Sequence, residues 1–263
     1  MLRPRLVVVL AVAAIAGTAA AQAAHGGGSA GAQLRIVALG DSDTTGSGDP
    51  TGAGWVGRYG RLLHQRLGIE TRVTNLAVDG TTSSRLLAAA RSNSAMRRTI
   101  AAADVVLIGI GGADLNAGDD RWQSGSCRGK ACYAADLRAF ARNLEATVAT
   151  VAKLRRGKKT VLRAITLPNA LTGAEDAIPG FLKPVATSIG VFQSNALRRA
   201  ICASMTRHAG RCVDVYRVFN GANGRANAYK KGLLNHTDCC YPSAMGQQLI
   251  AELLLRTGLK PVR

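Results

Sequence analysis

Short apolar runs that alternate with helical patterns are the feature that most constrains the fold of this chain. Five runs read as buried strands rich in branched aliphatic residues: 34–40, 71–78, 104–111, 159–168 and 211–219. Helical spacing of apolar residues predicts helices between and after them: 54–68, 83–92, 96–103, 134–156, 191–208 and 243–258. The stretches 112–133 and 169–184 are expected to be irregular loops. This alternation predicts an α/β fold with a mostly parallel, five-stranded sheet covered on both faces.

The amino end has the layout of a secretory signal peptide. Arg3 and Arg5 precede an apolar run, and small residues follow it. The fully apolar stretch 6–16 is shorter than the roughly 20 residues of a membrane span. We therefore expect a signal peptide over 1–23, a flexible lead-in over 24–33, one domain over 34–263 and no transmembrane span.

The cysteines fit a secreted protein, because disulfides persist in oxidising compartments. The chain has 6 cysteines, and the sequence alone does not choose among their pairings. We expect the local pairs Cys127–Cys132 and Cys202–Cys212. Cys239 and Cys240 would then form a vicinal bond or remain free. Paired C-x-x-C clusters are absent, so no metal or other cofactor is expected.

The net charge is strongly positive. Without Arg3 and Arg5 of the leader, 32 basic residues face 16 acidic ones, a net charge of +16. The simplest interpretation is a basic surface that only contacts solvent. The more specific hypothesis is that the charge attracts anionic cell-envelope polymers or lipid headgroups. No nucleic-acid partner is expected, because recognition motifs are absent and aromatic residues are few.

Polar segments that follow the strands carry the candidate chemistry, since ligands gather at the carboxyl ends of parallel strands. Ser42 lies on a Gly-rich turn just beyond Gly40, where a hydroxyl can be exposed beside free backbone N–H groups. Gly80 follows the second strand and can bring its own N–H to the same point. Considered alone, Ser42 is equally well explained as a helix-capping serine and Gly80 as an ordinary turn glycine.

Four stretches together resemble the SGNH (GDSL) hydrolase family: "GDSDTTG", "NLAVDG", "GGADL" and "DCCYPS". The blocks occur in the family's order over about residues 34–258. The resemblance implies a flavodoxin-like three-layer α/β/α sandwich and hydrolysis of acyl or acetyl esters of lipids or glycans. It also implies Ser42 as nucleophile, Gly80 as an oxyanion donor and Asp238 as a member of the catalytic group.

Two departures from the family pattern bear on catalysis. Ala113 occupies the place of the oxyanion-hole asparagine, and Tyr241 that of the histidine in Asp-x-x-His-Pro. A free phenol has a pKa of about 10, so it is a poor base at neutral pH. Removing the histidine of a serine triad costs on the order of 10⁶-fold in turnover.

Another histidine is a candidate base. His236 precedes Asp238 in the same loop and would reach Ser42 if the loop were re-routed; otherwise it is a solvated loop residue. His25, His64 and His208 are expected to lie in the tail, at the surface or in the core. Asp114 and Tyr241 are expected at the substrate-binding site, with Asp114 also able to accept backbone N–H groups.

The sequence thus favours a secreted or envelope-associated serine esterase with weak or atypical activity. The alternative is a catalytically impaired relative that binds acyl or glycan ligands at the cell envelope. The kept nucleophile turn favours the enzyme, whereas Ala113 and Tyr241 favour the binding protein.

Overall fold

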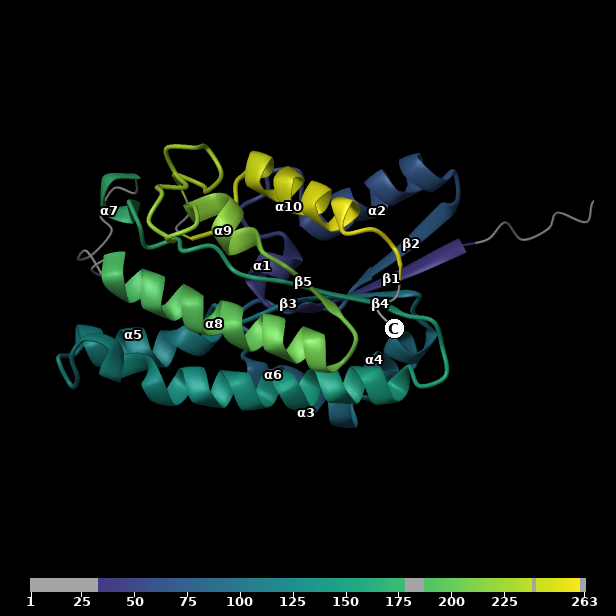
Figure 1. The fold of residues 1–263 in the computed structure, drawn as a ribbon, viewed down its shortest axis with the longest axis horizontal. Coiled ribbons are helices and arrows are strands. Elements are labelled where there is room, and N and C mark those ends of the chain that lie inside the picture. Colours follow the sequence, from purple (N-terminus) through teal and green to yellow (C-terminus); the bar gives the residue numbers. More distant parts are fainter. Residues whose placement is uncertain (1–32, 178–186, 238–239, 261–263) are drawn as a thin grey trace, which may run out of the picture. The chain divides into compact units, whose positions relative to one another are not determined.

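The computed structural model describes residues 33–177, 187–237 and 240–260. The predicted signal peptide and almost all of the predicted lead-in lie outside this part of the chain. Five strands form one sheet in the order β2-β1-β3-β4-β5, and every neighbouring pair is parallel (Figure 1). They are β1 (Gln33–Gly40), β2 (Glu70–Asn75), β3 (Val105–Gly109), β4 (Val161–Ile165) and β5 (Arg211–Val213).

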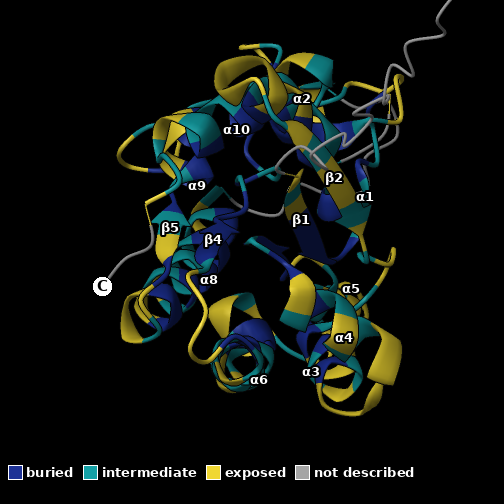
Figure 2. Ribbon diagram, turned by 90° about the vertical axis from the view of Figure 1, so that its right-hand side faces the viewer, coloured by how far each residue is buried: buried dark blue, intermediate teal, exposed yellow. Residues whose placement is uncertain are grey.

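The central strands are mostly apolar because both of their faces are covered; the exception in β4 is buried Arg163, which donates hydrogen bonds to backbone carbonyl oxygens. All five residues of β3 and all five of β4 are buried, as expected for strands inside a parallel sheet. Side chains of β1 alternate between two cores: Val37 and Leu39 face one, and Ile36 and Ala38 face the other. Figure 2 shows the buried residues concentrated in the strands and on the helix surfaces turned toward them.

One core lies between the sheet and four helices: α3 (Ser83–Ser92), α4 (Ser94–Ala102), α6 (Ala134–Leu154) and α8 (Thr187–Arg207). The long helix α6 buries Leu137, Phe140, Leu144, Val148 and Val151, the apolar stripe visible in the sequence. This stripe and the matching face of α8 cover strands β1, β3 and β4.

The second core lies on the other face, under α2 (Gly54–Leu67), α9 (Val215–Asn220) and α10 (Ala244–Arg256). Helix α2 begins where the buried carboxylate of Asp49 accepts the Gly54 backbone N–H at 3.0 Å. Arg58 pairs with the same carboxylate at 3.0 Å. The predicted three-layer α/β/α fold is therefore confirmed, with a sheet that is entirely parallel. Among the described residues, no helix is both long and apolar enough to cross a membrane.

Three details differ from the sequence predictions. The predicted strand 211–219 is a strand only to Val213, because Asp214 accepts the Arg217 N–H and starts helix α9. The predicted strand 71–78 ends at Asn75. The predicted loop 112–133 contains helix α5 (Asn116–Gln123) between two 3₁₀ turns. Polar contacts hold α5, such as that of the Tyr133 hydroxyl with Asp119 at 2.7 Å, so no apolar stripe marks it in the sequence.

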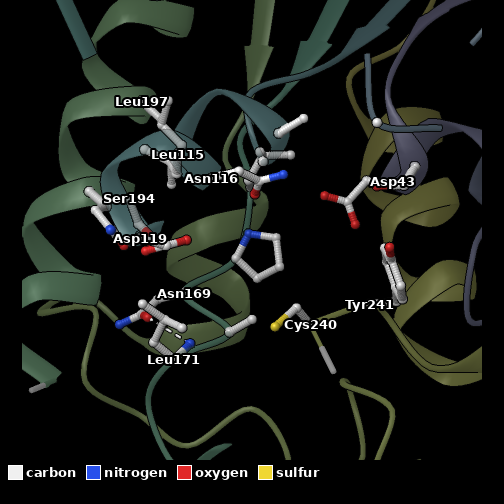
Figure 3. A pocket seen from close by; sticks show the side chains of 18 of the residues that line it. Asp43, Leu115, Asn116, Asp119, Asn169, Leu171, Ser194, Leu197, Cys240 and Tyr241 are labelled. Atoms are coloured by element: carbon white, nitrogen blue, oxygen red, sulfur yellow. Dashed lines mark hydrogen bonds between the residues drawn. The ribbon is translucent and has the colours of Figure 1, made fainter. Parts of the chain in front are cut away.

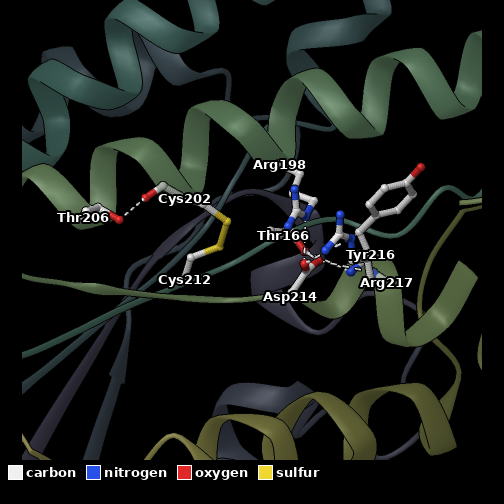
Figure 4. Close-up of a disulfide and its surroundings, with 8 residues drawn as sticks. All are labelled: Thr166, Arg198, Cys202, Thr206, Cys212, Asp214, Tyr216 and Arg217. Atoms are coloured by element: carbon white, nitrogen blue, oxygen red, sulfur yellow. Dashed lines mark hydrogen bonds and ion pairs between the residues drawn. A yellow bond between two sulfur atoms is a disulfide. The ribbon is translucent and has the colours of Figure 1, made fainter. Parts of the chain in front are cut away.

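Two predicted disulfides are confirmed. Cys127–Cys132 closes the loop after α5, and Cys202–Cys212 joins α8 to β5 (Figure 4). Cys240 is also disulfide-bonded, and Cys239 lies outside the described residues.

Candidate functional site

Ser42 is placed by a sharp turn at the carboxyl end of β1. Gly40 has a φ of 154°, and a Cβ there would lie 1.8 Å from the Gly109 carbonyl oxygen, so only glycine permits this approach of β1 to β3. Ser42 then opens the short helix α1 (Ser42–Thr45). The first N–H groups of a helix have no partner within it, and that of Ser42 donates to no acceptor among the described residues.

The carboxylate of Asp41 ties this turn to the end of β3. It is fully buried and accepts the N–H groups of Gly111 at 2.9 Å, Gly112 at 3.1 Å and Asp43 at 3.3 Å. Burial raises the pKa of Asp41 to about 6, although these three N–H groups lower it in part. Asp41 thus holds Ser42 in place rather than facing a ligand.

Ser42 lies at a cavity of about 410 Å³ at the carboxyl ends of the strands. Gly80, Ala113 and Tyr241 also line this cavity, so the structure brings together residues from all four sequence blocks. Apolar and polar side chains are mixed around it: in Figure 3, Leu115 and Leu197 lie on the same side as Ser194 and Asp119, and Asp43 and Tyr241 lie on the other side. Besides the four residues named, the lining comprises Asp43, Asp79, Gly112, Leu115, Asn116, Asp119, Leu167, Pro168, Asn169, Ala170, Leu171, Gln193, Ser194, Leu197 and Cys240.

Two backbone N–H groups at the cavity are available to bind an oxyanion. Gly80 has a φ of 66°, a left-handed conformation that glycine adopts without strain. Among the described residues its N–H has no acceptor, and the same holds for Ser42. Ala113 contributes no polar side-chain atom. Asn116, one helical turn further on, does line the cavity, in a segment that the sequence analysis read as a loop.

Tyr241 reaches the cavity through the turn that precedes α10. Pro242 pairs with Leu234 in an isolated antiparallel bridge, and the Tyr241 carbonyl accepts the Asn235 N–H at 2.9 Å. Tyr241 therefore lines the same cavity as Ser42, and its role in substrate binding stays a prediction. Asp238, predicted as a catalytic residue, lies outside the described residues.

The described histidines do not line the cavity. His236, the predicted base, contacts the Tyr229 carbonyl oxygen at 3.2 Å and the edge of its ring, with 5.7 Å between ring centroids. His64 contacts the Ile69 carbonyl oxygen, and His208 forms a hydrogen bond with Glu145. None of the described histidines is therefore positioned at the cavity to act as a base for Ser42.

Asp114 has a supporting position near the site. Its carboxylate accepts the backbone N–H and the hydroxyl of Ser83, at the start of α3, and it does not line the cavity. Burial raises the pKa of Asp114, and the hydrogen bonds from Ser83 oppose this rise. Asp114 thus ties α3 to the turn after β3.

Asp43 is a cavity residue that the sequence analysis missed. Its side chain is half-buried and lines the cavity, yet its Oδ1 atom is shielded from solvent and has no hydrogen-bond partner among the described residues. Burial raises the pKa of Asp43 well above its ordinary value, and the neighbouring Asp41 raises it further. In the sequence, only its position directly after Ser42 indicates that Asp43 belongs to the site. No group of three or more His, Cys, Asp or Glu suited to a metal occurs in the described part of the chain.

Comparisons with known proteins bear on the family and on the fold. The sequence model of the GDSL-like lipase/acylhydrolase family matches residues 38–249. The lipase Lip_vut3 from a goat rumen metagenome has 21% identity and a TM-score of 0.71, covering 88% of this chain and 100% of its own. A variant of the acetyl xylan esterase Axe2 from Geobacillus stearothermophilus has 20% identity and a TM-score of 0.58, covering 88% and 97%. A lipase/acylhydrolase from Enterococcus faecalis has 20% identity and a TM-score of 0.56, covering 88% and 99%. Comparison with curated protein sequences finds no significant match.

Proposed function

Because the chain belongs to the GDSL-like lipase/acylhydrolase family, we propose that it is a serine carboxylic ester hydrolase for acyl or acetyl esters of lipids or glycans. One observation carries this proposal: Ser42 borders a cavity of about 410 Å³, and the N–H groups of Ser42 and Gly80, which also line it, have no acceptor among the described residues. A nucleophile beside two preorganised donors is the arrangement that acyl transfer requires.

In the proposed reaction the Ser42 hydroxyl attacks the ester carbonyl, and the negative charge that develops on oxygen is held by the two N–H groups. Such donors are each worth about 10²–10³-fold in turnover. Ala113 supplies no third donor through its side chain, and no described histidine lines the cavity. We therefore expect slow turnover rather than none.

The cavity walls support an acyl or acetyl ester as the substrate class. The lining includes four leucines that provide apolar surface for an acyl chain, and polar groups such as Asn169 lie among them: Leu115, Leu167, Leu171 and Leu197. The related structures include a lipase and an acetyl xylan esterase, so both lipid and glycan esters belong in the first substrate panel.

A second candidate function is binding of an acyl or glycan ligand without turnover. The position of His236 against Tyr229, away from the cavity, favours it. The two candidates differ in one measurable respect: an enzyme forms a covalent adduct at Ser42, whereas a binding protein does not.

Labelling with a fluorophosphonate, together with hydrolysis of p-nitrophenyl acetate and octanoate, tests the proposal. We expect slow labelling and turnover that disappear in Ser42→Ala and persist in His236→Ala. Loss in His236→Ala would instead identify that histidine as the base. If neither probe distinguishes the parent from Ser42→Ala, the hydrolase proposal fails and ligand binding remains.

We further propose that the protein acts outside the cell or at its envelope, in contact with an anionic polymer. The predicted signal peptide and the disulfides support this location. A second cavity, of about 280 Å³, is lined by Lys130, Arg199 and Arg225, and none of these forms an ion pair with a described carboxylate. Phe192 lines the same cavity, with the Lys130 ammonium group 5.4 Å from its ring centroid. Neighbouring Arg198, in contrast, is neutralised by Asp214 at 2.7 Å.

Polyphosphate binding, measured by titration, tests this contact. Replacing Lys130, Arg199 and Arg225 by serine should weaken binding by on the order of tenfold. The control variant replaces three exposed arginines by serine and so removes the same charge: Arg66, Arg91 and Arg156. It should weaken polyphosphate binding much less. Equal effects of the two triple variants would show that only net charge matters. Binding to anionic lipid vesicles but not to polyphosphate would point to a membrane surface instead.

A further inference from the structure

The backbone of Asp43 is fixed on both sides. Its N–H donates to Asp41 Oδ1 at 3.3 Å, and its carbonyl accepts the indole N–H of Trp55 at 2.9 Å. Trp55 is itself fully buried at the start of α2. The side chain of Asp43 thus has a defined starting point next to Ser42 and extends to the same cavity (Figure 3).

The Asp43 carboxyl group differs from other buried or half-buried carboxyl groups in what it contacts. Asp41 accepts hydrogen bonds from three backbone N–H groups. Asp49 pairs with the Arg58 guanidinium group, and Asp119 accepts a hydrogen bond from the Tyr133 hydroxyl. Asp43 Oδ1 is equally shielded but has no described partner. A buried carboxyl oxygen without a partner lowers the stability of the folded protein, and a catalytic role is one reason why such a group is retained.

We propose that the Asp43 carboxylate is the proton acceptor for Ser42 and takes the role of the absent histidine; this rests on the proposed function. Both residues line the cavity, but within the described part of the chain no hydrogen bond joins the Asp43 carboxyl group to Ser42. In this proposal one water molecule in the cavity therefore relays the proton, and it contacts Asp43 Oδ2, because Oδ1 is shielded from solvent. Tyr241 lines the same cavity but is a weaker candidate, because a phenol is almost wholly protonated at neutral pH.

The steps balance as an ordinary double displacement. The Ser42 oxygen bonds to the ester carbon while its proton passes through the water to Asp43, and the carbonyl electron pair moves to the oxyanion. Collapse of this intermediate breaks the bond to the alcohol, which takes the proton from Asp43. Water then attacks the acyl group on Ser42, gives its proton to Asp43, and the serine leaves with that proton.

The surroundings make Asp43 a stronger base than a solvated aspartate. Burial raises its pKa, and so does the adjacent Asp41. The other titratable groups at this cavity are Asp79, Asp119 and Tyr241. Burial raises the pKa of Asp119 too, so a pH dependence alone does not identify Asp43, and the variants below separate the two.

The test is the pH dependence of kcat for the parent, Asp43→Asn, and the matched cavity variants Asp79→Asn and Asp119→Asn. In the parent, kcat should rise with pH as Asp43 ionises, with the midpoint above the 3.8 of an ordinary aspartate. Asp43→Asn should lower kcat by on the order of 10²-fold or more and remove this rise. The two matched variants should keep it.

Asp41→Asn provides a second readout that a purely structural role would not move. Removing the neighbouring charge should shift the rise in kcat to lower pH without abolishing it. If the rise vanishes in Asp41→Asn but persists in Asp43→Asn, Asp41 is the titrating group and the assignment is wrong. A parent-like kcat profile for Asp43→Asn overturns the role of Asp43 while leaving Ser42 catalysis intact. Absence of any Ser42-dependent turnover in the parent overturns both.

Discussion

The buried carboxyl of Asp41 should make protein stability depend on pH in a way that an Asp41→Asn variant lacks. The side chain is fully shielded from solvent, and burial raises its pKa from 3.8 to about 6. One pH unit corresponds to about 1.36 kcal/mol. Ionising Asp41 therefore costs about 3 kcal/mol more in the folded protein than in the unfolded chain.

The sign of the effect follows from which state ionises first. At pH values below 3.8 both states keep the proton, and the charge costs nothing. As the pH rises, the unfolded chain ionises first, so the folded state loses relative stability until its own pKa is passed. The free energy of unfolding of the parent should thus fall by about 3 kcal/mol relative to the variant between about pH 3.5 and 7.

Urea denaturation at a series of pH values measures this difference. Both proteins should carry Asp43→Asn, so that the neighbouring carboxyl group does not titrate. The asparagine cannot accept all three N–H groups, which adds a pH-independent loss of about 1 kcal/mol per hydrogen bond. A difference that stays constant with pH, or that favours the parent as pH rises, would refute the reasoning. It would mean that the N–H donors outweigh burial.

Three further changes have defined outcomes. Gly80→Ala places a Cβ where no atom lies within 4 Å, but at a φ of 66°. Backbone strain of about 1–2 kcal/mol should displace the N–H and lower kcat about tenfold with little change in KM, as steady-state kinetics would show. Arg58→Met leaves the buried Asp49 carboxylate unpaired and should lower the free energy of unfolding by about 3–5 kcal/mol in urea. Gly118→Ala would put a Cβ 2.3 Å from the Tyr133 ring. This overpacking should lower the free energy of unfolding by about 1–3 kcal/mol, which a lower melting temperature would show.

The sequence predicted the fold well where burial leaves a periodic signal. The run that became β3 is continuously apolar, and those of β1 and β4 are mostly so, because helices cover both faces of the sheet. Helix α6 was recognisable because it packs one apolar stripe. The predictions were wrong where local polar contacts decide: a single cap at Asp214 converts the expected strand into helix α9.

The candidate site was predictable in part. Ser42, Gly80 and Tyr241 follow strands or precede the last helix, and the topology alone brings them to one cavity. The position of His236 was not predictable, because it depends on a contact with Tyr229. Asn116 was missed for another reason: helix α5 has no apolar periodicity.

The two carboxyl groups beside Ser42 show why chemistry is harder to predict than fold. Asp41 and Asp43 are two residues apart, yet Asp41 accepts N–H groups from Gly111 and Gly112, some 70 positions later. Asp43 has no such donors, so burial acts on its pKa almost unopposed. A carboxylate with a raised pKa can serve as a base that a solvated one cannot. The absence of a histidine from the family's position is therefore not by itself evidence against catalysis at Ser42; the decisive quantity is the proton affinity of Asp43, which is set by tertiary structure.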